Sequence, residues 1–486
     1  MYLGIDIGTS SVKAVIVDAV GVLAAQASAA LDVSRPAPGY SEQDPEAWWQ
    51  GTVNAVRALP PAARAAVRAV GLSGQMHGAT LLDANDRPLR PAILWNDGRS
   101  VNECLELERR EPNARAITGN IMMPGFTAPK LLWVSRHEPE IFRRTACVLL
   151  PKDFVRLRLT GDKVSDMSDA SGTAWLDVGR RDWSDALLAA TGLTRAHMPR
   201  LVEGTSPSGS IGIAAAELLQ LPRVVVAGGG GDNAASAVGL GVVLPGQAFL
   251  SLGTSGVLFV VTDRFRPNPD RAAHAFCHCL PGRWHQMSVM LSAASVLDWV
   301  AQLTGESDLR RLVAAARERA LTRRSPFFLP YLSGERTPHN DPHSRGVFFG
   351  ISPDTNAADL TAAVLEGVAL AFADGMDVLL ETGGLVDEIS VTGGGARLPY
   401  WGQLLAAALN RPLSYRRGSE VGAALGAARL ARLALTGERV EDVCVAPPVE
   451  RVVQPEAALV SLLADRRRTF TRLYNDLKNT FMEFSA

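Results

Sequence analysis

The chain has 486 residues, and at about 100–200 residues per domain this length predicts two or three domains. Hydrophobic residues make up 47% of the chain and charged residues 20%, as is usual for a globular protein with a large core. The formal net charge of −1 provides no global basic field for nucleic acid, and no apolar run reaches the ~18 residues of a membrane span. We therefore expect neither nucleic acid nor a membrane as a partner, and a cytosolic location.

A β-hairpin is predicted at the N-terminus, where residues 2–7 and 12–18 are β-rich and flank a short turn. The turn contains Gly8-Thr9-Ser10, and such a turn presents N–H and O–H donors together, which suits phosphate. Thr9 is therefore a candidate phosphate contact. Asp6, on the entering strand, is a candidate carboxylate for Mg²⁺ bound through its waters, and a turn-stabilising Asp is the alternative.

A helix is expected over residues 46–59, followed by a strand over residues 67–72 that leads into a glycine-rich polar turn. Met76 and His77 lie in this turn and combine a flexible apolar side chain with a hydrogen-bonding imidazole. They are candidate contacts of a sugar. The alternative for His77 is a turn histidine whose hydrogen bonds are satisfied locally. Residues 100–220 are predicted to be mainly helical.

A second candidate site follows the strand expected over residues 223–227. Four glycines, 228–231, precede Asp232 and Asn233. Glycine lets the backbone approach a ligand, and an Asp at that edge can accept a proton from a substrate hydroxyl. Asp is also a preferred helix N-cap, so the local sequence supports a general base and a cap equally.

The first hairpin recurs halfway along the chain, where β-rich residues 247–252 and 257–261 flank the turn Gly253-Thr254-Ser255-Gly256. Two related turns, one in each half, indicate a phosphate chain held between two related lobes. Gly253 and Thr254 are the second pair of candidate phosphate contacts. We place the domain boundary at Pro245-Gly246, which gives an N-terminal domain over 1–245 and a C-terminal domain over 246–486.

Later in the chain, a long helix is expected over residues 358–381 and a strand over residues 388–392. Gly393-Gly394-Gly395-Ala396 follows and leads into another helix, a layout that accepts a nucleotide at bare backbone and a helix N-terminus. Residues 457–484 predict an amphipathic helix packed on the second domain. The P-loop and dinucleotide-binding motifs are absent, and the spread of glycine turns suits phosphoryl transfer.

Two longer stretches carry a resemblance to a known family. Residues 125–133 resemble the first signature of the FGGY carbohydrate kinases, and residues 346–351 with 359–366 resemble the second. The likeness runs from Tyr2 to about Tyr474, and it implies the two-lobed α/β ATPase fold of actin, hexokinase and Hsp70, with ribonuclease H-like duplicated domains and a cleft between the lobes. Residues 41–45, 74–78, 94–99 and 329–336 resemble the family members that act on D-xylulose.

The resemblance implies phosphorylation of D-xylulose to D-xylulose 5-phosphate with ATP and Mg²⁺, by a homodimer. Under it, Asp232 matches the general base for the C5 hydroxyl, and Asp6 matches the residue needed for Mg-ATP chemistry. The remaining matches are the sugar contacts Met76, His77 and Asn233, the second phosphate loop at Gly253 and Thr254, and the adenosine turn at Gly394, Gly395 and Ala396.

Two alternatives remain open at this point. A kinase for another sugar or polyol, such as ribulose, gluconate or glycerol, would differ only in a few pocket contacts. A non-catalytic sugar sensor could share the fold, although the presence of both Asp232 and Asp6 argues against it. The chain departs from the family pattern at Arg397-Leu398, where relatives often have a small polar residue, so nucleotide contacts beyond Ala396 are not assigned.

Overall fold

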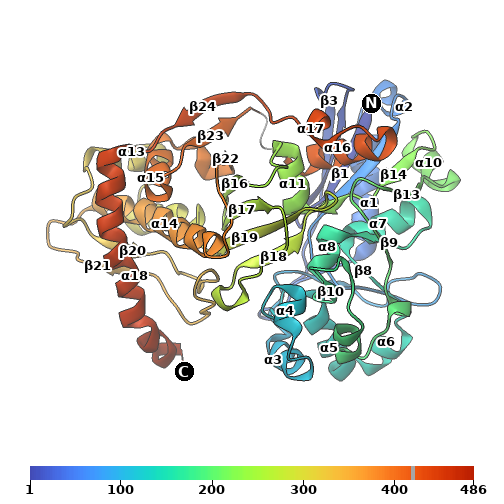
Figure 1. Ribbon diagram of the computed structural model, residues 1–486, viewed down its shortest axis with the longest axis horizontal. Helices are drawn as coiled ribbons and strands as arrows, with labels where there is room; N and C mark the ends of the chain where they lie inside the picture. Colours follow the sequence, from blue (N-terminus) through green and yellow to red (C-terminus); the bar gives the residue numbers. More distant parts are fainter. Residues whose placement is uncertain (418–421, 486) are drawn as a thin grey trace.

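The computed structural model describes residues 1–417 and 422–485, without the side chains of Ala396 and Ser485. Each half of the chain builds one large sheet, and Figure 1 shows the two sheets side by side with helices packed around them. Within the described residues, no helix combines the length and the apolar character needed to cross a membrane.

The first sheet has the strand order β13-β14-β5-β1-β2-β3, with β15 paired to β5. Its strands are β1 (Tyr2–Ile7), β2 (Ser11–Val17), β3 (Leu23–Ala30), β5 (Ala69–Gly74), β13 (Pro207–Ser210), β14 (Val225–Ala227) and β15 (Gly230–Gly231). Strands β1 and β2 form the expected antiparallel hairpin, with Asp6 opposite Lys13. Strand β5 runs parallel to both β1 and β14.

The second sheet has the order β18-β19-β17-β16-β22-β23-β24. Its strands are β16 (Gln247–Leu252), β17 (Gly256–Thr262), β18 (His274–Cys277), β19 (Trp284–Met290), β22 (Glu388–Thr392), β23 (Leu413–Arg416) and β24 (Val449–Val453). Strands β16 and β17 form the second expected hairpin, with Leu252 opposite Gly256. Strand β22 runs parallel to both β16 and β23.

The two sheets share one topology. Three antiparallel strands, β3-β2-β1 in the first sheet and β19-β17-β16 in the second, continue into two parallel strands, β5-β14 and β22-β23. In each half, a helix lies in the connection from the outer antiparallel strand to the first parallel strand. Helix α1 (Pro45–Arg57) lies between β3 and β5, and helix α14 (Ala357–Leu380) lies between β19 and β22. This confirms the duplicated α/β fold predicted from the sequence, and it puts the two Gly-Thr-Ser turns at equivalent positions.

Residues 100–220 are mainly helical, as predicted, and they form most of the region between β3 and β15. Its helices are α2 (Pro61–Ala65), α3 (Val101–Arg110), α4 (Ala114–Thr118), α5 (Thr127–His137), α6 (Pro139–Arg144), α7 (Pro151–Thr160), α8 (Met167–Ser171), α9 (Asp185–Ala190) and α10 (Ile213–Leu219). Short strands punctuate it: β4 (Glu42–Gln43), β6 (Thr80–Leu82), β7 (Ala92–Ile93), β8 (Cys147–Leu149), β9 (Val164–Asp166), β10 (Leu176–Asp177), β11 (Asp182–Trp183) and β12 (Arg200–Val202).

The second half carries its own helices. They are α12 (Ser295–Thr304), α13 (Leu309–Glu318), α15 (Pro399–Leu409), α17 (Val440–Val443) and α18 (Ala457–Ser485), with a small ladder of β20 (Phe327–Leu329) and β21 (Val347–Phe349). The long C-terminal helix α18 packs on α14, α15 and β20, in line with the expectation that it covers the second domain (Figure 1).

Two helices join the halves. Helix α11 (Asp232–Leu240) follows the first sheet, and α16 (Gly422–Thr436), from the second half of the chain, packs on α11 and on β1 and β5 (Figure 1). The approach is backbone to backbone, because a Cβ added at Gly4 or Gly71 would overlap the carbonyl oxygen of Ala424 or Ala427 on α16. The domain boundary expected at Pro245-Gly246 stays a prediction, and α16 lies spatially with the first sheet.

We expect Gly71→Ala to destabilise the fold by about 3 kcal/mol, because the new methyl group meets rigid helix backbone that no rotamer change can clear. Urea denaturation measures the change. Gly212→Ala is the matched control, since the nearest atom to its Cβ is the Leu159 carbonyl oxygen at 3.6 Å. Equal losses in the two variants would contradict the close packing of α16 as the cause.

Candidate functional site

A cavity of about 920 Å³ lies between the two halves of the molecule. Both sheets and both joining helices contribute to its wall, which includes Asp6, Lys13, Asn233, Ser236, Ser251, Gly393, Gly394, Arg397, Arg416 and Ala423. Three predicted site residues, Asp6, Asn233 and Gly394, therefore share one cavity although they are far apart in the sequence. Among the described residues, the lining does not include the other predicted site residues, whose surroundings are described next.

Asp232 is the first residue of α11, and the N-cap of that helix is Gly231. The Asp232 Oδ1 atom accepts hydrogen bonds from the main-chain N–H of Asn233 at 2.7 Å and from its side-chain amide at 2.9 Å. The alternative interpretation of Asp232 as an N-cap is therefore wrong. Burial, together with the nearby negative charge of Asp6, raises the pKa of Asp232 to about 7, a value suited to a general base at neutral pH.

Asp6 faces the cavity from the end of β1. Its Oδ1 atom is buried and has no hydrogen-bond partner among the described residues. Burial raises the pKa of Asp6, while the hydroxyl of Ser73 and the ammonium of Lys13 act in the opposite direction. A buried carboxylate oxygen at a cavity wall that still has hydrogen-bonding capacity is the kind of atom that binds a hydrated cation.

Thr9 is held in a polar network around the first turn. Its hydroxyl donates to Gln75 Oε1 at 2.9 Å and accepts from the indole N–H of Trp95 at 3.0 Å. The side-chain amide of Gln43 donates to the Thr9 carbonyl at 2.7 Å. Because the single hydroxyl hydrogen is used by Gln75, a contact from Thr9 to phosphate requires its main-chain N–H or a change of this bond. Sequence reasoning did not assign individual roles to Gln43 or Gln75, and it took Trp95 and its polar neighbours as a stretch suited to polyhydroxy compounds.

His77 has a left-handed backbone with φ of 69°, which costs a non-glycine residue about 1–3 kcal/mol. Its Nδ1 atom lies 2.6 Å from the carbonyl oxygen of Gly172. Since a carbonyl only accepts, Nδ1 carries the hydrogen and Nε2 is left as an acceptor. Burial lowers the pKa of His77 to about 3, so the imidazole is neutral.

The side chains of Met76 and His77 occupy space that exists only because two neighbouring residues are glycines. A Cβ at Gly172 would lie 2.5 Å from the His77 ring, and a Cβ at Gly231 would lie 3.0 Å from Met76 Sδ. Met76 therefore packs against the residue that precedes Asp232, which brings the predicted sugar contacts next to the predicted base. Gly172 was missed from the sequence, where it is one glycine among many.

The two turns expected to bind the nucleotide lie against each other. A Cβ at Gly395 would be 2.7 Å from the side chain of Leu252, the last residue before Gly253. The Gly253 carbonyl accepts the N–H of Ala294 at 2.7 Å, just before α12. Thr254 is exposed, and the position of a Cβ at Gly394 is open space. The side chain of Ala396 lies outside the described residues, and Arg397 lines the cavity.

A buried cluster of charged and polar side chains forms hydrogen bonds with the main chain around the Gly228–Asp232 turn. Arg156, which is 0% exposed, donates to the carbonyls of Ala227 at 2.6 Å and Gly228 at 2.5 Å. The hydroxyl of Ser168 accepts the N–H of Gly231 at 3.0 Å. Lys152 in turn pairs with Asp166 at 2.9 Å and Asp169 at 3.2 Å. Sequence reasoning missed this cluster. The signal that could have found it is the presence of charged residues inside otherwise apolar segments.

Comparison with known proteins identifies relatives of the whole chain. The sequence models of the FGGY family of carbohydrate kinases match residues 1–239 for the N-terminal domain and residues 248–435 for the C-terminal domain. Xylulose kinase of Escherichia coli (strain K12) is 54% identical over 479 residues, which cover 98% of this chain and 99% of that protein. Xylulose kinase of Klebsiella pneumoniae is 52% identical over 480 residues, with the same coverage of 98% and 99%.

The fold has a close counterpart among solved structures. The crystal structure of a "xyloylose kinase" from Brucella ovis superposes with a TM-score of 0.95 at 50% sequence identity, covering 99% of each chain. Together with the family match, this confirms the two-lobed ATPase fold of the actin and hexokinase type that the sequence predicted.

The raised pKa of Asp232 has a consequence for stability. Its ordinary pKa is 3.8 and its pKa in the folded protein is about 7. At a pH between these two pKa values, the unfolded chain has released a proton that the folded chain retains. The stability that this group contributes is therefore fully present below pH 3.8 and is lost as the pH rises through about 7.

We therefore expect Asp232→Asn to gain stability relative to the parent as pH rises from about 4 to about 8, because the amide does not ionise. Thermal melting at a series of pH values measures the difference. Gly212→Ala, which changes no ionisable group, is the control and should show no such trend. A pH-independent difference at Asp232 would contradict the raised pKa.

Proposed function

Because the chain belongs to the FGGY family of carbohydrate kinases, we propose that it transfers the γ-phosphoryl group of ATP to D-xylulose, giving D-xylulose 5-phosphate and ADP. The observation that carries the proposal is the placement of Asp232, a carboxyl with a pKa of about 7 beside Asp6 and Met76. It lies in a chain that is 54% identical to a xylulose kinase.

Asp232 is the general base of the proposed reaction. Asn233 holds Oδ1 with two hydrogen bonds, so the free oxygen Oδ2 takes the proton of the sugar's C5 hydroxyl. As that proton leaves, the hydroxyl oxygen forms a bond to the γ-phosphorus, and the bond from the γ-phosphorus to the departing ADP oxygen breaks. Base catalysis of this kind contributes about 10²–10⁴-fold.

The sugar is proposed to lie against Met76 and His77, with Asn233 and Asp232 at its reacting end. The neutral imidazole of His77 offers Nε2 as an acceptor for a sugar hydroxyl, because Nδ1 is used by Gly172. Met76 supplies an apolar surface for the carbon skeleton. A neutral acceptor and a carboxylate together favour a ligand rich in hydroxyl donors.

ATP is proposed to bind along the cavity, with its phosphates near the two Gly-Thr-Ser turns at Thr9, Gly253 and Thr254. Its adenosine is assigned to the turn of Gly394, Gly395 and Ala396. Asp6 fits a role in holding Mg²⁺ through water, since its buried Oδ1 has no partner among the described residues. When bound, Mg²⁺ neutralises charge that develops on the phosphate oxygens. The homodimer and the cytosolic location expected from the sequence stay predictions.

We expect Asp232→Asn to lower kcat by at least ~10²-fold while ATP and D-xylulose still bind, because only the proton acceptor is lost. In the parent enzyme, kcat/KM should rise with pH through about 7, as Asp232 loses its proton. A coupled assay of ADP release measures both quantities, and calorimetry measures binding. Near-normal turnover of the variant would rule out Asp232 as the base.

Substrate choice is tested by ADP release with Mg-ATP in the presence of D-xylulose, L-ribulose, D-ribulose, gluconate, glycerol or no sugar. We expect strong stimulation by D-xylulose alone, because the proposed sugar contacts Met76 and His77 occur in a chain closely related to xylulose kinases. Stimulation by another compound would retain the kinase mechanism and reject the substrate. Stimulation by none would favour a sugar sensor.

A further inference from the structure

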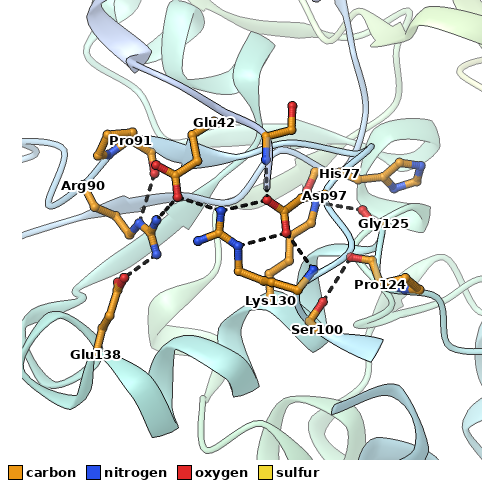
Figure 2. Close-up of polar contacts among 12 residues, drawn as sticks. Glu42, His77, Arg90, Pro91, Asp97, Ser100, Pro124, Gly125, Lys130 and Glu138 are labelled. Atoms are coloured by element: carbon orange, nitrogen blue, oxygen red, sulfur yellow. Dashed lines mark hydrogen bonds and ion pairs between the residues drawn. The ribbon is translucent and has the colours of Figure 1, made fainter. Parts of the chain in front are cut away.

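Lys130 is a buried amine whose hydrogen bonds go to the main chain of the site. It lies on α5 and is 0% exposed. Its Nζ atom donates to the carbonyl oxygen of His77 at 2.9 Å and to that of Gly125 at 2.8 Å (Figure 2). Burial lowers the pKa of Lys130 well below its ordinary value, and the charge of Asp97 opposes this effect. An amine can donate both bonds whether or not it carries its third proton.

The carboxylates near Lys130 are already used by other groups. Asp97 accepts four hydrogen bonds, three from Arg99 at 3.0, 2.9 and 2.7 Å and one from the N–H of Ser41 at 2.6 Å. Glu42 pairs with Arg90 (Figure 2). It also pairs with Arg99, at 2.7 Å. Arg90 and Arg99 therefore form the ion pairs with these two carboxylates. The amine group of Lys130 binds main-chain carbonyl oxygens instead.

The carbonyl that Lys130 binds belongs to the strained residue of the site. His77 has a φ of 69°, in the left-handed region that a Cβ disfavours. A second donor from α5, the hydroxyl of Thr127, reaches the same carbonyl at 3.1 Å. Two donors on one rigid helix therefore hold the His77 carbonyl in the direction that the left-handed backbone gives it. That backbone also determines where the imidazole lies against Gly172.

We propose that Lys130, assisted by Thr127, is a positioning residue that holds the backbone of His77 so that its imidazole faces the sugar. The proposal rests on the role proposed above for His77 as a sugar contact. Lys130 itself touches neither the sugar nor the nucleotide in this scheme. Its loss should therefore weaken productive sugar binding and leave nucleotide binding unchanged.

The test compares KM for D-xylulose with KM for ATP in Lys130→Met and Thr127→Val. We expect KM for the sugar to rise about tenfold or more in Lys130→Met, and less in Thr127→Val, while KM for ATP stays unchanged. Thr127→Val keeps the shape of a residue that is 0% exposed, so it carries the test if Lys130→Met fails to fold. An equal rise of both KM values would overturn the proposal.

Two matched controls separate positioning from general loss of a buried donor. Thr52 is also 0% exposed and donates to the Trp48 carbonyl at 2.8 Å within helix α1. Arg64 is a buried cation that donates to the Leu219 carbonyl at 3.1 Å. Thr52→Val and Arg64→Met should leave KM for the sugar unchanged, and a rise equal to that of the test variants would overturn the proposal.

A double-mutant cycle with His77→Asn distinguishes the two proposals. Asn tolerates the left-handed backbone, so this variant removes the imidazole and keeps the main chain. Lys130→Met should add no further rise in KM for the sugar on the His77→Asn background, since it acts through that imidazole. Additive effects would overturn the role of Lys130. An unchanged KM in His77→Asn alone would instead overturn the role of His77 as a sugar contact.

Discussion

The direct backbone contact between α16 and the first sheet is the constraint on which the rest of the structure depends. Gly4 and Gly71 leave no room for a side chain between β1, β5 and the carbonyl oxygens of α16. A helix from the second half of the chain is thereby fixed beside α11 and under the strand that carries Asp6. Small residues at these positions are what allow two separate sheets to share one cavity.

Burial has opposite effects on the two titratable groups proposed to meet the sugar. It raises the pKa of Asp232 to about 7 and lowers that of His77 to about 3, because an apolar environment disfavours the charged form of either group. The result is a neutral imidazole that accepts hydrogen bonds beside a carboxyl that exchanges its proton near neutral pH. One physical cause thus produces two different chemical roles.

The site also uses buried basic side chains to hold main-chain carbonyls. Arg156 binds the carbonyls of Ala227 and Gly228 behind the base, and Lys130 binds those of His77 and Gly125 behind the sugar contact. At Gly229, glycine itself permits the positive φ. At His77 the Cβ disfavours it, so the chain there adopts a conformation that local sequence preferences do not provide. A strong donor placed on a helix compensates for that lack of local preference.

The sequence by itself determined the two hairpins, the strands over residues 67–72, 223–227 and 388–392 and the candidate residues of the site, because these depend on local periodicity and turn chemistry. It therefore located Asp6, Met76, His77 and Asp232, and it left Asp232 open between base and cap. Only the tertiary structure excluded the cap, since Gly231 occupies that position, and the raised pKa of Asp232 beside Asp6 supports the proposed base. Only the tertiary structure shows the contacts of Gly172, Lys130 and Arg156, because these contacts join segments that are distant in the chain.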